Sequence, residues 1–196
     1  MMKRIVIIAL FVSACSMHAA VRDSIYRVEL VGSMLVQATS YDVAPTSLSA
    51  TDRFTGSSLV GRAIWRPNHY LGVGVQTGYT TFSAEEFGEQ LVVQQANAYA
   101  SLRAIPLQLV LSMRAFGVEV GTGIGVYLLE SIWRVNGEQR VNSTASELGV
   151  SSWIGYDIEI LDRLNIGPEV NLHVLSGRGI VALGAGLRVR YDLLRY

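Results

Sequence analysis

The chain has 196 residues, 50% of them hydrophobic, and its 16 basic and 16 acidic side chains balance to a formal net charge of +0. This length suits one small domain and excludes a wide porin, while the absence of a basic stripe argues against nucleic acid as a partner. A single cysteine excludes an intramolecular disulfide.

The N-terminal segment predicts export. Residues 1–20 place Lys3 and Arg4 before an apolar run and end in small residues, which is the pattern of a secretory signal peptide. We expect this segment to be removed, so that the mature domain spans residues 21–196. Lys3 is the only lysine, and arginine therefore supplies all the basic side chains of the mature domain. Arginine suits buried, bidentate ion pairs better than lysine does.

Two routes of cleavage remain open. Residues 12–15, VSAC, resemble the lipobox of bacterial lipoproteins, in which the cysteine becomes the acylated first residue, so Cys15 is a candidate for lipidation. Alternatively, the small residues at 17–20 suit ordinary signal peptidase, which would discard Cys15. Ordinary cleavage is favoured if the mature domain is itself embedded in the membrane, because such a domain needs no lipid anchor.

The remainder of the chain shows apolar residues that alternate with small, polar or charged ones. Because successive residues of a strand point to opposite faces, each such segment predicts a strand with one apolar face. The pattern is clearest at residues 116–128, FGVEVGTGIGVYL, where Val120 would face lipid and Glu119 and Gly121 the interior. After residue 20 no apolar run approaches the roughly 18 residues of a membrane-spanning helix. In hydrocarbon, strands with this polarity require a closed barrel.

Eight strands follow from this pattern in chain order: residues 26–37, 57–66, 71–79, 91–109, 116–128, 147–159, 165–174 and 181–191. The fourth, which contains Pro106, is the least regular, and we expect a bulge in it. The sequence thus predicts an all-β fold, an antiparallel eight-stranded transmembrane up-and-down β-barrel. An even number of strands returns both termini to the periplasm.

The predicted connections alternate in length, as they do in outer-membrane barrels. Outer loops at 40–56, 83–90 and 130–146 are long, whereas inner turns at 66–70, 112–115 and 161–163 are short; the last outer loop, 176–179, is the exception. Asn136-Gly137 predicts a projecting hairpin within the third outer loop. Five aromatic residues would face lipid near the periplasmic end, as an interfacial girdle does: Tyr26, Trp65, Phe116, Tyr156 and Tyr191.

Charged residues on the inward faces predict a plugged lumen. Eight strands leave an interior that side chains fill, so we expect these charges to pair across the axis and block it. A gated ion path is the alternative. No metal-ligand cluster is present and no cofactor is expected. The predicted lumen charge network comprises Arg27, Glu29, Arg62, Glu119, Asp157, Glu159, Glu169, Arg188 and Arg190.

A lipid-modifying enzyme is the third functional alternative. Some small outer-membrane barrels modify lipid A with a His and a Ser on neighbouring strand positions, and here His173 and Ser176 lie near the outer rim. They are an odd number of residues apart, however, and would point to opposite faces of a regular strand. The His-x-Ser spacing is absent because residue 175 is Leu. We therefore predict that the protein is not an enzyme.

Three local features carry a resemblance to a known family. Residues 103–109, RAIPLQL, are similar to a proline-containing strand motif, and a glycine-rich segment follows at 117–129. The chain ends in an aromatic residue, Tyr196, although Asp192 interrupts the alternation of apolar and polar residues counted back from it. In these features the chain resembles small outer-membrane β-barrel proteins of the porin-like group, with OmpX- and OmpA-like barrels. The resemblance implies an integral protein of the bacterial outer membrane, with Tyr196 in a signal read by the barrel-assembly machinery.

These observations predict a structural or surface-interaction role, with a narrow channel or a lipid A-modifying enzyme as alternatives. The expected partners are outer-membrane lipids and lipopolysaccharide, the barrel-assembly machinery, and an extracellular ligand bound through loops 40–56 and 130–146. We expect a monomer that binds no nucleic acid.

Overall fold

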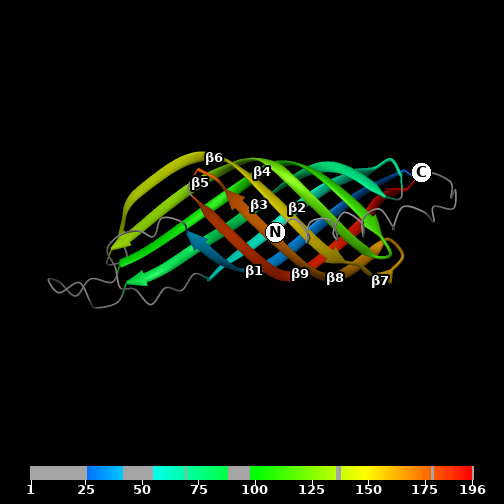
Figure 1. The fold of residues 1–196 in the computed structure, drawn as a ribbon. Helices are drawn as coiled ribbons and strands as arrows, with labels where there is room; N and C mark the ends of the chain where they lie inside the picture. The colour runs from blue at the N-terminus through cyan, green and yellow to red at the C-terminus, as the bar shows by residue number, and fades with distance from the viewer. Residues whose placement is uncertain are drawn as a thin grey trace, which may run out of the picture.

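The structure, a computed structural model, describes residues 26–41, 55–68, 70–87, 98–135, 138–177 and 179–195 (Figure 1). The predicted signal peptide 1–20, Cys15, the Asn136-Gly137 turn and Tyr196 lie outside these residues. None of the described residues belongs to a helix long and apolar enough to cross a membrane. The strands are β1 Arg27–Tyr41, β2 Thr55–Arg66, β3 Leu71–Phe87, β4 Ala98–Ala115, β5 Val118–Val135, β6 Glu138–Tyr156, β7 Ile158–Leu161, β8 Leu164–Leu175 and β9 Ile180–Arg195.

These strands form one closed antiparallel barrel. Each strand from β1 to β5 pairs with the next along the chain, β9 pairs with both β1 and β8, and β6 pairs with β8. β7 continues the pairing of β6 with β8 in the same register after a break at Asp157. β6 and β7 are therefore one strand of the barrel, which has eight, and the predicted fold class is confirmed.

The end with the short turns carries three tight connections. Asn68 Oδ1 accepts hydrogen bonds from the backbone N–H groups of Tyr70 and Leu71 and so shapes the β2–β3 turn. Between β4 and β5, Phe116 and Gly117 have φ angles of 53° and 79°, the positive values of a two-residue type I′ hairpin. The predicted turn at 112–115 is therefore wrong, because β4 continues to Ala115 and the chain reverses at the next two residues.

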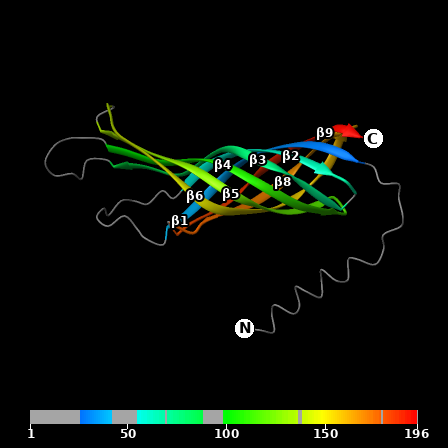
Figure 2. The ribbon, with the colours of Figure 1, turned by 90° about the horizontal axis from the view of Figure 1, so that it is seen from above.

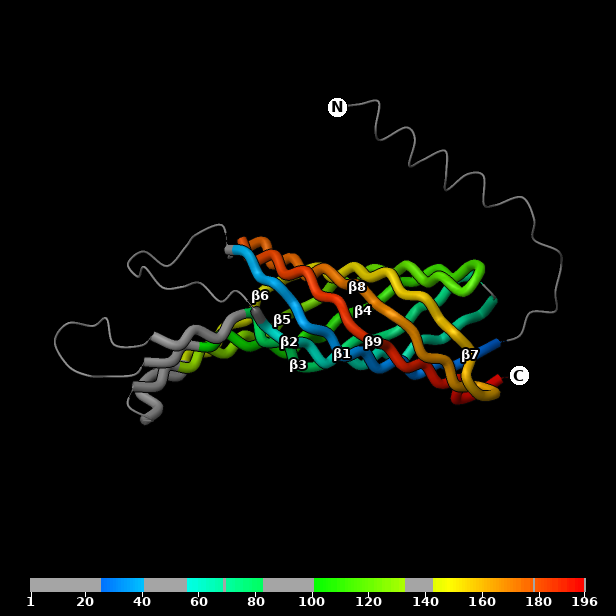
Figure 3. Tube along the Cα trace, turned by 90° about the horizontal axis from the view of Figure 1, so that it is seen from below, coloured from blue at the N-terminus to red at the C-terminus, as the bar shows by residue number. Residues whose placement is uncertain are grey.

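The opposite end of the barrel is uneven. β5 and β6 remain paired as far as Val135 and Glu138, whereas β8 pairs with β6 only from Gly149 inward. β3 also continues to Phe87 beyond a bulge near Phe82, so much of the predicted outer loops 83–90 and 130–146 is strand. Figures 2 and 3 show β4, β5 and β6 extending past the ends of β8 and β9. A projecting sheet of β3 to β6 thus rises on one side of the barrel.

The outer face of the barrel is apolar, as the alternation predicted. Met34, Leu109 and Ile124 are 72%, 69% and 65% exposed, while Glu119 and Gly121 on the opposite face of β5 are buried. The five girdle aromatics are also exposed, at the end with the short turns. An exterior this rich in exposed apolar side chains is stable in hydrocarbon and unfavourable in water. The closed barrel is therefore an integral membrane protein, with its short turns on the periplasmic side.

Candidate functional site

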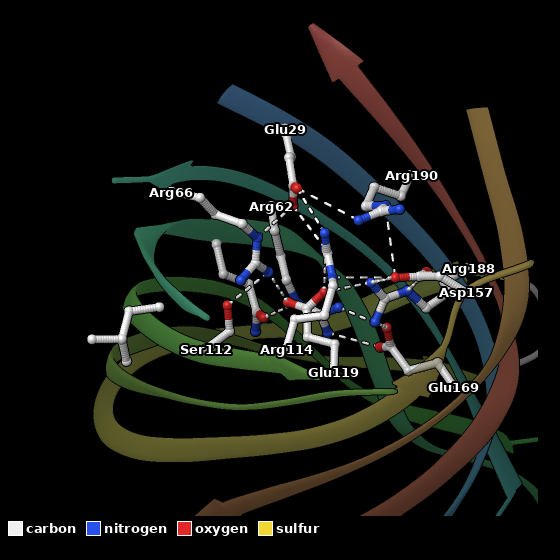
Figure 4. Close-up of polar contacts among 12 residues, drawn as sticks. Glu29, Arg62, Arg66, Ser112, Arg114, Glu119, Asp157, Glu169, Arg188 and Arg190 are labelled. Atoms are coloured by element: carbon white, nitrogen blue, oxygen red, sulfur yellow. Dashed lines mark hydrogen bonds and ion pairs between the residues drawn. The ribbon is translucent and has the colours of Figure 1, made fainter. Parts of the chain in front are cut away.

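The candidate site is a group of buried charges in the periplasmic half of the lumen (Figure 4). Seven of the eight barrel strands contribute a residue to it, and β3 borders it through Gln76, because each strand presents every second residue to the interior. We call this group the charge network. Its members are Glu29, Arg62, Arg66, Arg114, Glu119, Asp157, Glu169, Arg188 and Arg190.

Glu119 is the centre of the charge network. Its Oε1 lies 2.8 Å from Nη2 of Arg66, and its Oε2 lies 2.8 Å from Nη2 of Arg114 and 2.7 Å from Nη2 of Arg188. These arginines come from β2, β4 and β9, and the carboxylate is completely buried. One carboxylate thus joins three strands that are not neighbours in the sheet.

Glu169 forms the innermost ion pair. Arg62 donates to both of its oxygens, at 2.7 and 2.8 Å, which is the bidentate geometry that a guanidinium favours. Ser33 donates a further hydrogen bond to Oε2 at 2.9 Å. The Arg62 guanidinium also lies over the ring of Trp153, 4.1 Å from its centroid, and Nε donates to Gln76. These contacts fix Arg62 across the axis of the barrel.

Glu29 and Asp157 bind the arginines nearest to the periplasm. Glu29 accepts from Nε of Arg66 and from both Nη atoms of Arg114, each at 2.8 Å. Asp157 lies 3.1 Å from Nε of Arg188. Arg190 reaches these two carboxylates only at 3.5 and 3.6 Å.

Two residues of the predicted network lie elsewhere. Arg27 is partly exposed and lies 3.7 Å from the buried Asp192, which also binds Arg195 at 2.6 Å, so these three form a separate group at the periplasmic mouth. Glu159 is exposed on β7, and its predicted place in the lumen is wrong. The physical reason is that β7 lies at the end of the barrel, where all four of its residues are exposed.

The sequence reasoning missed two arginines of the charge network. Arg66 is on the inward face of β2 and was not assigned to the network, while Arg114 was placed in a turn. The signal for Arg114 was available, because Leu107, Leu109, Leu111 and Met113 continue the outward alternation and direct residues 112 and 114 inward.

Amide and hydroxyl groups fill the middle of the lumen. Gln108 Oε1 accepts from Nε2 of Gln76 at 2.6 Å and from Oγ of Ser151 at 2.8 Å, and Gln108 Nε2 donates to the Tyr127 hydroxyl. That hydroxyl lies 2.8 Å from Nδ1 of His173. This polar layer connects the charge network to the outer half of the barrel.

An apolar cap closes the outer half of the lumen. Each residue of this cap is at most 3% exposed, and its large side chains meet across the axis: Phe82, Ala104, Tyr127, Leu129, Leu175, Ile180 and Ala182. His173 is completely buried beneath this cap, with its ring edge-on to Phe82, while Ser176 lies in the exposed β8–β9 turn. The two residues of the enzyme alternative are therefore separated. No group of three or more candidate metal ligands occurs among the described residues.

Gly121, on the inner face of β5, leaves room for the Trp153 ring on which the Arg62 guanidinium lies. A Cβ placed on Gly121 would collide with the Trp153 ring. We expect Gly121→Ala to lower the free energy of unfolding by about 1–3 kcal/mol through overpacking. Gly32→Ala is the matched control, because Gly32 faces lipid with no atom within 4 Å of an added Cβ. Urea unfolding of the barrels in lipid measures both, and equal stability of the two variants would contradict this packing.

Comparison with known proteins supports the fold alone. No protein-family model matches the chain, and no curated protein is similar to it in sequence. One similar solved structure is that of Ail, the attachment invasion locus protein of Yersinia pestis, in complex with the heparin analogue sucrose octasulfate. It has a TM-score of 0.52 and 10% sequence identity, and the alignment covers 85% of this chain and 99% of that chain.

Two further solved barrels have TM-scores below 0.5. Neisserial surface protein A has a TM-score of 0.45 at 14% identity, over 87% of this chain and 98% of that one. The N-terminal β-barrel domain of Pseudomonas aeruginosa OprF has a TM-score of 0.45 at 7% identity, over 84% and 98%. The similarity to Ail confirms the predicted likeness in fold to small outer-membrane barrels. A closed barrel with an apolar exterior and short turns at one end is an integral outer-membrane protein.

Proposed function

We propose that this protein acts at the cell surface through its projecting sheet, and that its lumen is a structural plug. The observation that carries the proposal is the filling of the lumen from the periplasmic mouth outward. The bidentate Arg62–Glu169 pair crosses the axis, the Gln76–Gln108 layer follows, and the apolar cap closes the outer half. Water and ions need a continuous polar path, which an eight-stranded barrel filled in this way does not offer.

The projecting sheet supports a role in binding. Beyond Gly149, residues 138–146 of β6 pair with β5 on one side, and no other described strand pairs with them on the other. A free strand edge presents unpaired backbone N–H and C=O groups, to which an extended segment of a partner protein can add. We propose an extracellular protein as the ligand, bound beside residues 130–146.

Conductance tests the plug. Purified protein in a planar bilayer should show small or absent conductance, because its lumen lacks a water-filled path. A steady, large conductance would overturn the plug and favour the channel alternative. Mass spectra of lipid A from strains with and without the protein should be identical, since His173 is buried and Ser176 lies in an exposed turn. A changed lipid A would favour the enzyme alternative.

Adhesion tests the surface role. Cells that expose the full barrel should bind host cells or extracellular matrix better than cells without it. A variant in which residues 132–142 are replaced by an Asn-Gly turn should lose this binding and retain the plug, because the shortened hairpin lies outside the barrel. Unchanged adhesion of the variant would contradict the proposed role of the projecting sheet.

The other expected partners remain part of the proposal. We propose lipopolysaccharide and other outer-membrane lipids as the surroundings of a monomeric barrel, and Tyr196 as part of its assembly signal. Processing by signal peptidase or acylation at Cys15 would leave the barrel itself unchanged.

A further inference from the structure

The charge network holds one more arginine than it has carboxylates. Four carboxylates, Glu29, Glu119, Asp157 and Glu169, face five arginines, Arg62, Arg66, Arg114, Arg188 and Arg190. The neighbouring group at the mouth does not correct this balance, because its three arginines, Arg27, Arg163 and Arg195, are matched by three carboxylates, Glu159, Asp162 and Asp192. The charge network by itself thus carries a net charge of +1.

An arginine cannot remove such an excess by losing a proton. Its guanidinium stays protonated in proteins, unlike the ammonium of a buried lysine. An uncompensated charge in a low-dielectric interior is costly, and it therefore requires an anion or water beside it. One of the five guanidinium groups must therefore carry the excess positive charge.

The contacts single out Arg190. Its only carboxylate contacts among the described residues are 3.5 Å to Glu29 and 3.6 Å to Asp157, and both carboxylates lie nearer to other arginines. Its Nε, like the Nε atoms of Arg114 and Arg188, is buried without a hydrogen-bond partner, so Arg190 is distinguished by its long distances to the carboxylates. Figure 4 shows Arg190 at the margin of the network, between Glu29 and Asp157.

The same guanidinium lies on the open side of the network. The side chains of Arg190 and Arg114 are 8% and 12% exposed, whereas that of Arg188 is completely buried. Asn165 is directly opposite Arg190 in the β8–β9 pairing and is buried on the same inward face, so the two side chains start from neighbouring positions on the lumen wall. A small ion arriving from the periplasm would meet these groups first.

We propose that the periplasmic mouth of the lumen binds one monovalent anion, of the size of chloride, on the Arg190 guanidinium beside Asn165. One such ion neutralises the charge network and supplies the acceptor that Nε of Arg190 lacks. The anion thereby completes the plug from the periplasmic side. This site is independent of the surface role proposed above.

Thermal unfolding in defined anions tests the site. Barrels refolded in a nonionic detergent are heated at constant ionic strength while chloride replaces gluconate, an anion too bulky for the lumen. The unfolding temperature of the unmodified protein should rise with the logarithm of the chloride concentration, by roughly 5–10 °C once chloride exceeds its Kd about a hundredfold. A flat response would overturn the proposal.

Three variants make the test specific. Arg190→Gln removes the excess charge and should be at least as stable as the unmodified protein in gluconate, with no response to chloride. Asn165→Asp supplies a permanent carboxylate opposite Arg190 and should also abolish the response. Arg27→Gln alters only the separate group at Asp192 and should retain it. The proposal fails if Arg190→Gln and the unmodified protein respond equally to chloride, or if Arg27→Gln loses the response.

Discussion

Replacing Glu119 with alanine should lower the free energy of unfolding by about 3–5 kcal/mol, the usual cost of removing one partner of a buried ion pair. The carboxylate lies within 2.7–2.8 Å of Arg66, Arg114 and Arg188, and all three would lose their shared counter-ion. The network would then hold five arginines and three carboxylates. Urea unfolding, followed by the difference in gel migration between folded and unfolded barrel, measures the change.

Asp162→Ala is the control for this experiment. The Asp162 side chain is 80% exposed in the β7–β8 turn, and its ion pairs with Arg163 and Arg195 lie in solvent. Surface pairs of this kind contribute at most about 1 kcal/mol. A Glu119→Ala barrel as stable as the unmodified protein, with altered ion selectivity in a bilayer, would contradict the plug and favour a channel.

Ile124→Arg should lower the free energy of unfolding by about 2–4 kcal/mol, the cost of a cationic side chain at the middle of a bilayer. Ile124 is 65% exposed on the outer face of β5, midway between Phe116 in the periplasmic girdle and the polar residue Glu130. The substitution places a guanidinium in hydrocarbon without an acidic partner. Unfolding of the barrel from lipid vesicles measures the effect.

A substitution nearer to the membrane interface on the same strand provides the control. Val118 begins β5 beside the girdle residue Tyr156, so Val118→Arg lies near the interface and should cost only about 0–1 kcal/mol. Cysteine at Ile124 should react with a probe embedded in the membrane, whereas cysteine at the inward Ser112 should not. Equal labelling at the two positions would contradict the facing of β4 and β5.

The facing of the strands was predictable because it depends only on neighbouring residues. In β5, Val120 and Ile124 are exposed while Glu119 and Gly121 are buried, as a period of two requires. The turn before β5 was not predictable in this way, since a phenylalanine at positive φ is rare and Phe116-Gly117 is not a usual type I′ pair. That single error of register at the turn removed Arg114 from the predicted network.

The irregular C-terminal strand has a structural explanation. Val28 of β1 is opposite Leu194 and Glu29 is opposite Asp192, so Leu193 is an extra residue in the pairing. The bulge leaves Leu193 and Leu194 both exposed and directs Asp192 inward. The sequence shows the interruption at Asp192, but the bulge that causes it depends on pairing with a strand more than 150 residues away.

The contacts between side chains inside the lumen could not be predicted from the alternation of apolar and polar residues. Alternation places Tyr127 and Leu129 on the inward face, yet it does not say which inward residues meet across the axis. The structure brings them together with Phe82 and Leu175 from distant strands, as part of the apolar cap. A prediction from polarity alone therefore described the charged half of the lumen and omitted its apolar half.

The distances in sequence between the ion-paired residues have a consequence for the order of folding. Arg62 is 107 residues from Glu169, and Glu29 is 161 residues from Arg190. No hairpin of adjacent strands can form these pairs by itself, so they assemble only when β1 and β9 meet. Contacts of such long range form slowly, and interactions made after the rate-limiting step chiefly retard unfolding. These long-range pairs of the charge network therefore form when the barrel closes, and their principal effect is a long lifetime of the assembled barrel.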